Sequence, residues 1–410
     1  MSRNIGFVSF RFSGTDGVSL ETAKWAQVLE QRGDTCHWFA GELNTPDERS
    51  MLVPQAHFNH AEVEAISRES FGATTRTRSL TGRIHQLREE LKDSLHTFIE
   101  RYAVDVLIPQ NALAIPMNVP LGMALTELIA ETGIVTVAHH HDFAWERDRF
   151  ARTAIGDILS SSYPPALERI RNVVINSAAQ QQLALRRGVS STLVPNVMDF
   201  DVPVRGVDEF NSDLRERLGV RDDEWFILQP TRIVPRKGIE HAVELVASLS
   251  SPAALVVSHA AGDEGYAYRA RLERFAKALG VRMVFADGWI ADERSEGSSD
   301  KRFDLADAYA HADFVTYPSL VEGFGNAFLE AVQARKPILV NRYPVYEQDI
   351  RPLGFDVVEM NGMVDADTVA QVESFLASPA RRQEAAEKNF ALAKTHFSYD
   401  RLEELLYRLM

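Results

Sequence analysis

The chain has 410 residues, of which 45% are hydrophobic and 25% are charged, a composition that excludes a fibre or a mostly disordered chain and allows two or three globular domains. Its formal net charge of −14 makes it a poor binder of nucleic acids, so any phosphate chemistry must depend on a few locally placed cations. The single cysteine, Cys36, excludes an intramolecular disulfide and a zinc-thiolate site.

The N-terminal segment enters an apolar run at once, without the charged region and long apolar region of a secretory signal. No apolar stretch of the sequence is long enough to span a bilayer. We therefore expect a cytoplasmic protein.

Short apolar runs alternate with helical patterns in the first half of the chain. The segment from Val18 to Leu29 has the spacing of an amphipathic helix, and Gly33 ends it. This alternation predicts βαβ units and a parallel sheet. The predicted strands are residues 5–10, 35–39, 104–108, 134–138, 173–176 and 192–194.

Residues 196–224 interrupt this rhythm with a loop-like stretch and a polar helical stretch from Glu209 to Leu218. The alternation then resumes, which predicts two doubly wound domains, 1–200 and 201–395, joined near residue 200. Leucines at helical spacing predict a final amphipathic helix within residues 396–410. The predicted strands of the second half are residues 225–229, 254–258, 282–286, 314–317 and 338–341.

Residues that follow strands are the first candidates for chemistry, because ligands of open α/β sheets bind beyond the carboxyl ends of the strands. After the first strand, the segment Ser13-Gly-Thr-Asp-Gly17 could present backbone amides to a phosphate. A plain tight turn explains this segment equally well.

Three histidines and an aspartate, His139 to Asp142, follow the strand 134–138. Histidine side chains at a strand end suit proton transfer or hydrogen bonding. A metal site is less favoured, because adjacent residues point in diverging directions. A loop in which one histidine is merely hydrogen-bonded is the alternative.

Two cations follow the strand 225–229 in the segment Thr231-Arg-Ile-Val-Pro-Arg-Lys-Gly238, which opens a predicted helix over 239–249. Arg232 and Lys237 beside a helix N-terminus suit a diphosphate. The segment is neither a P-loop nor a dinucleotide-binding fingerprint, which weakens ATPase and dehydrogenase interpretations.

The strongest local signal is the segment Glu322-Gly-Phe-Gly-Asn-Ala-Phe-Leu-Glu330, which follows the strand 314–317. Its two glycines let a ligand approach the backbone at the start of a helix, where the helix dipole favours an anion. Glu322 in the loop and Glu330 in the helix can each accept two hydroxyls of a sugar or a ribose. The alternative is an ordinary strand–helix turn with a solvated glutamate.

Together and in this order, these segments resemble family 4 of the retaining nucleotide-sugar glycosyltransferases, which have the GT-B fold. Glu322 to Glu330 matches the family's E-x7-E motif, and Arg232 and Lys237 match the pair that binds the donor diphosphate. Asn196-Val-Met-Asp199 is similar to the family's N-G-V-D hinge segment, with valine in place of the usual glycine. The resemblance covers nearly the whole chain and is looser in residues 40–130.

The resemblance implies an α/β protein of GT-B architecture, with two doubly wound Rossmann-like domains facing across a cleft. The first domain binds the acceptor, the second binds the nucleotide sugar, and the C-terminal helix crosses back to the first. The implied activity moves a hexose from GDP-mannose or UDP-glucose, with retention, to a hydroxyl of a small, polar or anionic acceptor. The nucleotide sugar is a co-substrate, and we expect no metal and no other cofactor.

The resemblance also implies roles for individual residues. Arg232, Lys237 and Glu322 act at the reacting centre, with His139 or His141 beside it. The implied donor-binding residues are Gly17, Gly323, Phe324, Gly325, Asn326 and Glu330.

Cations on the first domain indicate how an anionic acceptor would bind. Residues 68–92 carry a local net charge of +3 in an otherwise acidic chain. Phosphate or carboxylate groups suit such cations, although a solvated helix face of mixed charge is the alternative. The acceptor-binding candidates are Asp142, Arg76, Arg78 and Arg147.

Other activities on this fold stay open. Residues 139–147 also resemble enzymes that make small sugar-based solutes, such as the mannosylglucosylglycerate synthases. A membrane lipid is a less expected acceptor, because residues 83–102 mix charges instead of forming a basic amphipathic surface. The alternatives are a nucleotide-sugar 2-epimerase, a sugar phosphorylase and a non-catalytic binder of sugar nucleotides. No sequence feature predicts the oligomeric state.

Overall fold

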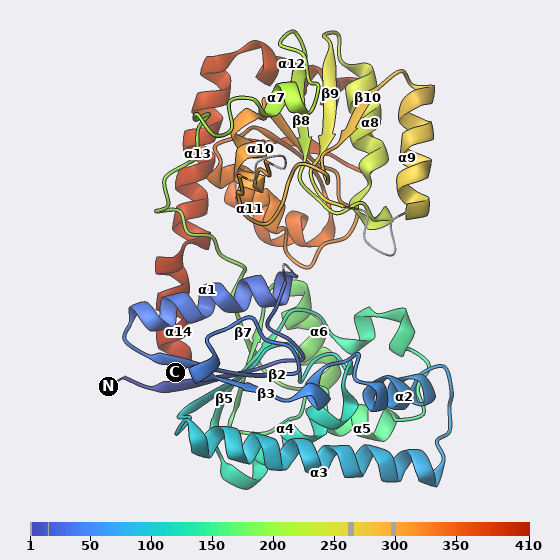
Figure 1. Ribbon diagram of the computed structural model, residues 1–410, viewed down its shortest axis with the longest axis vertical. Coiled ribbons are helices and arrows are strands. Elements are labelled where there is room, and N and C mark those ends of the chain that lie inside the picture. Colours follow the sequence, from blue (N-terminus) through green and yellow to red (C-terminus); the bar gives the residue numbers. More distant parts are fainter. Residues whose placement is uncertain (1, 15, 261–265, 297–300) are drawn as a thin grey trace. The chain divides into compact units, whose positions relative to one another are not determined.

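The computed structural model describes residues 2–14, 16–260, 266–296 and 301–410. The chain divides into two compact units (Figure 1). Unit 1 comprises Met1–Val197 with Tyr399–Met410, and unit 2 comprises Met198–Ser398. Among the residues described, no helix is both long enough and apolar enough to cross a membrane.

Unit 1 is built on a seven-stranded sheet in the order β3-β2-β1-β4-β5-β6-β7. All of its strand pairs are parallel. The central strands are largely apolar, as expected for a parallel sheet whose two faces are both covered by helices. They are β1 (Asn4–Val8), β2 (Thr35–Ala40), β3 (Ser50–Leu52), β4 (Val106–Pro109), β5 (Val135–His140), β6 (Ile170–Val174) and β7 (Ser191–Leu193).

Two hydrophobic cores lie on the two faces of this sheet, because successive residues of a strand point to opposite sides. Val137 of β5 joins the core beneath α1, and Ala138 joins the core beneath α3 and α4. The helices of unit 1 are α1 (Gly17–Gln31), α2 (Ala61–Ser70), α3 (Arg78–Arg101), α4 (Val119–Thr132), α5 (Gly156–Ser162), α6 (Ser177–Arg187) and α14 (Tyr399–Leu409).

The C-terminal helix α14 belongs to unit 1, which confirms the predicted return of the chain end to the first domain. Its apolar stripe is buried in the same core as Trp25 and Leu29 of α1. At the ends of this contact, Tyr399 donates a hydrogen bond to Gln27, and the Arg32 guanidinium lies over the Tyr407 ring. The buried leucines of α14 are Leu402, Leu405, Leu406 and Leu409.

Unit 2 has a six-stranded parallel sheet in the order β10-β9-β8-β11-β12-β13. Its strands are β8 (Trp225–Gln229), β9 (Ala253–Val257), β10 (Arg282–Phe285), β11 (Phe314–Tyr317), β12 (Ile338–Asn341) and β13 (Val358–Met360). Its helices are α7 (Leu214–Arg217), α8 (Ile239–Ser248), α9 (Tyr266–Ala278), α10 (Leu305–His311), α11 (Asn326–Gln333), α12 (Ala366–Ala377) and α13 (Pro379–Phe397).

The strand order of each sheet reverses at one point. In chain order, the second and third strands of each sheet are added on one side of the first strand. The fourth strand pairs on the other side of the first, and the later strands continue outward from it. The first and fourth strands are β1 and β4 in unit 1, and β8 and β11 in unit 2. Ligands of doubly wound sheets bind at such a switch point, beyond the carboxyl ends of the two strands. In unit 2, the loops that leave this point are those of Arg232 and Glu322.

Several local predictions were wrong. The short edge strands β3 and β13 were not predicted, because neither contains a run of apolar residues. The predicted helix from Glu209 to Leu218 is reduced to the single turn of α7. Before α7, the Asn211 amide donates to Asp208 and the Asn211 side chain donates to Asp307. Strand β5 runs two residues beyond the predicted end, through His139 and His140.

Candidate active site

The two loops at the switch point of unit 2 are in direct contact. The loop after β8 ends in a 3-10 turn over Pro235–Lys237, and the amide of Leu320, in the loop after β11, donates to the Arg236 carbonyl at 2.8 Å. Gly238 allows this approach: it has a φ of +59°, and a Cβ there would lie 2.6 Å from the Pro318 carbonyl oxygen.

Lys237 and Glu322 form a buried ion pair between these loops. The Lys237 ammonium donates to one carboxylate oxygen, and Nη1 of Arg236 donates to the other at 2.9 Å. Burial raises the pKa of Glu322, but the charges of Lys237 and Arg236 outweigh it and hold the pKa below its usual value. Burial is the main cause that lowers the pKa of Lys237, assisted by Arg236 and Arg232. The structure thus brings together the cation and the carboxylate that the sequence singled out.

The glycine-containing loop that follows Glu322 is shaped by a tyrosine. The Tyr343 hydroxyl donates to the Phe324 carbonyl at 2.7 Å. Gly325 has a φ of +134°, and a Cβ there would lie 2.3 Å from that hydroxyl. Only glycine fits this position, and helix α11 begins at the next residue, Asn326. Gly323, by contrast, is exposed.

Glu330 lies in α11 and is half-buried. The Tyr309 hydroxyl, from α10, donates to Glu330 Oε2 at 3.2 Å. Burial, together with the Glu330 charge, raises the pKa of Tyr309 well above its usual value, so the tyrosine stays a neutral donor. Sequence reasoning missed Tyr309, since nothing in the helical pattern of α10 marks a residue that faces Glu330.

Arg232 is exposed, and no hydrogen bond or ion pair of its side chain is found among the residues described. Its charge is close enough to lower the pKa values of Lys237 and His259, although burial is the larger cause for both. His259 comes two residues after β9, and its Nδ1 lies 2.8 Å from the Ser258 hydroxyl. Because ligands of open α/β sheets bind beyond the carboxyl ends of strands, the position of His259 just after β9 could have marked it as a candidate in the sequence.

The three histidines of unit 1 have different environments. His139 is buried, stacks on Trp25 with ring centroids 4.2 Å apart, and has no hydrogen-bond partner for either ring nitrogen in the described part of the chain. Burial lowers its pKa well below the usual value, so it is neutral. His140 points to the other face of the sheet, where its Nε2 lies 2.9 Å from Asn172 Oδ1.

His141 is half-buried, and its Nε2 lies 3.1 Å from Gln110 Oε1. Burial lowers the pKa of His141 to about 4, against the opposing charges of Asp142 and Asp16, so this imidazole is neutral at neutral pH. Of the histidines predicted for the site, His141 is therefore the one that is accessible, while His139 packs behind it with ring centroids 4.3 Å apart.

Asp142 is held by residues from two segments. Asn111 Nδ2 donates to one carboxylate oxygen at 2.6 Å, and Arg147 Nε donates to the other at the same distance. Asn111 Oδ1 also accepts from the amides of His141 and Asp142, and Asn111 itself has a φ of +59°. Gln110 and Asn111 were missed, although polar residues directly after strand β4 could have been found by the strand-end rule.

The Asp16 carboxylate caps the N-terminus of α1 and occupies amides of its first turn. Asp16 Oδ1 accepts from the amides of Val18 and Ser19 at 3.1 and 3.2 Å, and Asp16 Oδ2 pairs with Arg11. A Cβ at Gly17 would meet no heavy atom within 4 Å, so the space beside it is open. Thr15, which is part of this predicted loop, lies outside the described residues.

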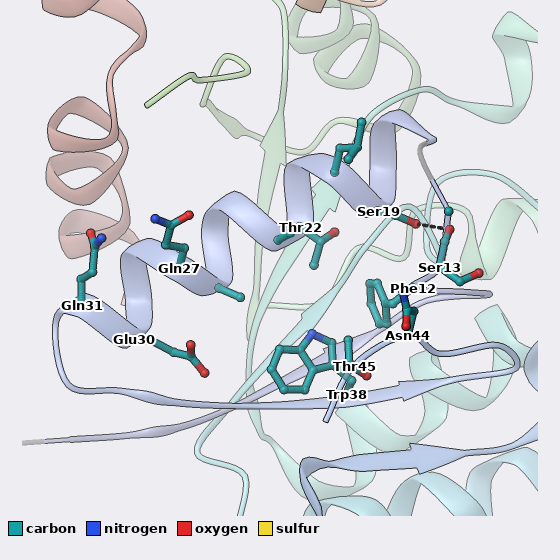
Figure 2. Close-up of a pocket in the computed structure, with 14 residues that line it drawn as sticks. Phe12, Ser13, Ser19, Thr22, Gln27, Glu30, Gln31, Trp38, Asn44 and Thr45 are labelled. Carbon is teal, nitrogen blue, oxygen red and sulfur yellow. Dashed lines mark hydrogen bonds between the residues drawn. The ribbon is translucent and has the colours of Figure 1, made fainter. Parts of the chain in front are cut away.

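A groove of about 540 Å³ runs beside α1, a volume within the range of small-molecule sites. Figure 2 shows Phe12 and Trp38 on one side of it and polar side chains of α1 on the other. Ser13 and Gly14 of the predicted loop contribute to its lining, and the Ser19 hydroxyl donates to the Ser13 carbonyl at 3.3 Å. None of the residues predicted for the site lines this groove.

The cations of residues 68–92 are largely paired with carboxylates. Arg76 forms a two-pronged ion pair with Asp157. Arg78, the first residue of α3, is exposed. Of the arginines predicted to bind the acceptor, Arg147 pairs with Asp142, whereas Arg76 pairs with Asp157. The other pairs are Arg83 with Glu62 and Glu69, Arg88 with Glu89 and Glu127, and Lys92 with Glu89, Glu127 and Glu131.

Within the described ranges, no group of three or more histidine, cysteine or acidic side chains is arranged to hold a metal ion. At the switch point of unit 2, the charged groups are the cations of one loop and Glu322 of the other. In unit 1, the polar groups after β5 are His141 and Asp142.

The sequence of this chain is similar to those of known glycosyltransferases. The family described as "Glycosyl transferases group 1" matches residues 210–391. A mannosylglucosylglycerate synthase of Thermotoga maritima is 32% identical over 438 residues, covering 98% of this chain and 99% of the relative. A protein of the same name from Petrotoga mobilis is also 32% identical, covering 88% of this chain and 87% of the relative.

A solved structure supports the fold. The crystal structure of HepE from Anabaena in complex with UDP-glucose matches with a TM-score of 0.65 and 14% identity, covering 99% of this chain and 98% of that one. At this identity the match shows the fold alone, and it agrees with the predicted GT-B architecture of two Rossmann-like domains.

Proposed function

This chain belongs to the group 1 glycosyltransferases, and we propose that it moves a hexose, with retention, from a nucleoside diphosphate sugar to a hydroxyl of a small anionic acceptor. The observation that carries the proposal is the contact between the two switch-point loops of unit 2. There Lys237 and Arg236 meet Glu322, and Arg232 lies close by.

The donor would be held by unit 2. Arg232 and Lys237 bind the diphosphate, together with the backbone amides at the start of α11. Glu322 and the amides of the loop 323–325 bind the sugar hydroxyls. Glu330, oriented by the hydrogen bond from Tyr309, accepts the ribose hydroxyls.

The chemical step breaks the bond between the anomeric carbon and the diphosphate oxygen, so negative charge develops on the diphosphate. Arg232 and Lys237 stabilise that charge in a partly buried site, where fixed charges act more strongly than in water. The departing phosphate oxygen takes the proton of the acceptor hydroxyl on the same face of the sugar. This front-face displacement retains the anomeric configuration and needs no protein nucleophile.

The acceptor would be bound by unit 1. His141 is neutral at neutral pH, so it serves as a hydrogen-bonding group and not as a source of charge. Asp142, fixed by Asn111 and Arg147, accepts from an acceptor hydroxyl. Arg78 and Arg147 are exposed and could meet an anionic group, Arg147 alongside its ion pair with Asp142, whereas Arg76 is less exposed and pairs with Asp157.

The names of the relatives guide the choice of substrates. Both curated relatives are mannosylglucosylglycerate synthases. On this basis we propose GDP-mannose as the donor, ahead of UDP-glucose, and a glucosylglycerate-like compound as the acceptor. The carboxylate of glycerate is the anionic group that the cations of unit 1 would bind.

The test combines binding and transfer. Isothermal titration with GDP and with UDP names the donor base, and incubation with the matching nucleotide sugar and glucosylglycerate gives the product. Appearance of a longer glycoside, dependent on the acceptor, supports the proposal. An epimerised nucleotide sugar formed without acceptor would support a 2-epimerase instead, and sugar phosphate formed from the glycoside and inorganic phosphate would support a phosphorylase.

A further inference from the structure

Glu322 is bound by two cations that differ in their access to solvent. Its side chain is 9% exposed and that of Lys237 is 11% exposed, so this pair is almost enclosed. The side chain of Arg236 is 45% exposed and reaches Glu322 from the outside. Each carboxylate oxygen therefore has its own partner.

Arg236 is hydrogen-bonded to three residues of the loop that contains Glu322. Its carbonyl accepts from the Leu320 amide at 2.8 Å, and its Nη1 donates to the Val321 carbonyl at 3.2 Å and to Glu322 Oε2 at 2.9 Å. Three consecutive residues of the loop are thus bonded to one arginine, which lies next to Lys237 in the chain.

The donor diphosphate and Glu322 would compete for the Lys237 ammonium. In the proposed function, which this inference takes as its premise, the Lys237 ammonium binds the donor diphosphate. A single positive charge cannot fully compensate both the diphosphate and Glu322. A buried carboxylate that loses its partner is strongly destabilised, so donor binding would be opposed unless a second cation stays with Glu322.

We propose that Arg236 is a positioning residue that holds Glu322 ionised and in place while Lys237 turns to the diphosphate. Arg236 acts through Glu322 and does not bind the phosphates itself. The Glu322 loop then keeps its geometry in both states, and the carboxylate stays available to the sugar hydroxyls.

A double-mutant cycle on GDP and UDP binding, measured by isothermal titration, tests this assignment. We expect Arg236→Ala to weaken binding of the preferred nucleotide about tenfold, the usual size of a lost charged contact. In a Glu322→Gln background the same substitution should change affinity less than about twofold, because no buried carboxylate then needs a partner. Arg274→Ala, at an exposed arginine of α9, is the matched control for loss of one positive charge.

A pH titration gives a second readout that a merely structural role would not move. Arg236 is one of the charges that lower the pKa of Glu322, so Arg236→Ala should shift the acid limb of nucleotide binding to higher pH, and Arg236→Lys should restore it. Melting temperatures of all variants show that each is folded.

The outcomes separate this inference from its premise. An equal loss of affinity in both backgrounds would show that Arg236 contacts the phosphates directly and would overturn the inference alone, as would unchanged binding by Arg236→Ala. Absence of GDP and UDP binding to the unmodified chain would overturn the proposed function, and the inference with it.

Discussion

Lys237 and Glu322, which are 85 residues apart in the chain, form a buried ion pair where the strand order of unit 2 reverses. The pair joins the loop after β8 to the loop after β11. In the proposed function the Lys237 ammonium also binds the donor diphosphate, so Glu322 and the diphosphate compete for the same cation. The ion pair holds the two loops in contact.

The cations of this loop should dominate turnover. We expect Lys237→Ala and Arg232→Ala each to lower turnover by at least about a hundredfold, since in the proposed function each removes a charge that stabilises the leaving diphosphate. Steady-state kinetics with nucleotide sugar and acceptor measures this, and Arg274→Ala serves as the control. Near-normal turnover in both variants would be incompatible with the diphosphate assignment.

Gly325 should tolerate no side chain. Gly325→Ala places a Cβ 2.3 Å from the Tyr343 hydroxyl at a φ of +134°, so we expect a loss of about 1–3 kcal/mol in the free energy of unfolding together with weaker nucleotide binding. Chemical denaturation measures the loss. Gly288→Ala, where a Cβ would meet no atom within 4 Å, is the control and should change the free energy by less than about 0.5 kcal/mol.

The buried histidines should make unit 1 acid-sensitive. Burial lowers the pKa of His140 from 6.5 to about 4, with His141 adding to the effect against the Asn172 hydrogen bond. As pH falls from about 6.5 to about 4, His140 becomes protonated in the unfolded chain but stays neutral in the folded chain. The contribution to the free energy of unfolding that is present above pH 6.5 is therefore lost.

The variant His140→Gln isolates this term. The loss assigned to His140 is on the order of 3 kcal/mol. Urea unfolding at several pH values should therefore show a flatter pH dependence for the variant than for the unmodified chain. The same slope in both proteins would exclude His140 as a source of the acid sensitivity.

Arg147 and Arg76 should separate acceptor binding from stability. Arg147→Ala frees one oxygen of Asp142, and we expect about a tenfold higher KM for the acceptor with an unchanged KM for the donor. Arg76→Ala removes an ion pair with a largely exposed Asp157, so stability should fall by about 1 kcal/mol or less with an unchanged acceptor KM. A higher acceptor KM for Arg76→Ala alone would reverse these assignments.

The sequence predicted the two parallel sheets and the loops of unit 2 because both depend on local patterns. Apolar runs marked the strands, and Arg232, Lys237 and Glu322 lie in the loops that follow strands β8 and β11. The neighbouring positions of β8 and β11 in the sheet then bring these loops together. The two edge strands β3 and β13 were missed because edge strands need no apolar run.

Side-chain pairing across distant segments could not be predicted. Arg76 has a partner, Asp157, that is 81 residues away, and the pairing depends on which helix ends lie side by side. The burial of His139 depends on β5 continuing through two histidines, for which strand propensity gives no signal. Arg236 is adjacent to Lys237 in the sequence, but only the structure shows that its side chain donates a hydrogen bond to Glu322.

The stereochemistry of the transfer reaction tests the central claim most directly. The unmodified chain is incubated with GDP-mannose and glucosylglycerate, and with UDP-glucose in parallel, while NMR follows the anomeric proton of the product. We predict a new glycoside with the α-configuration of the donor, formed only when the acceptor is present, and its loss in Lys237→Ala. A product of inverted configuration, or no acceptor-dependent product from either donor, would contradict the account.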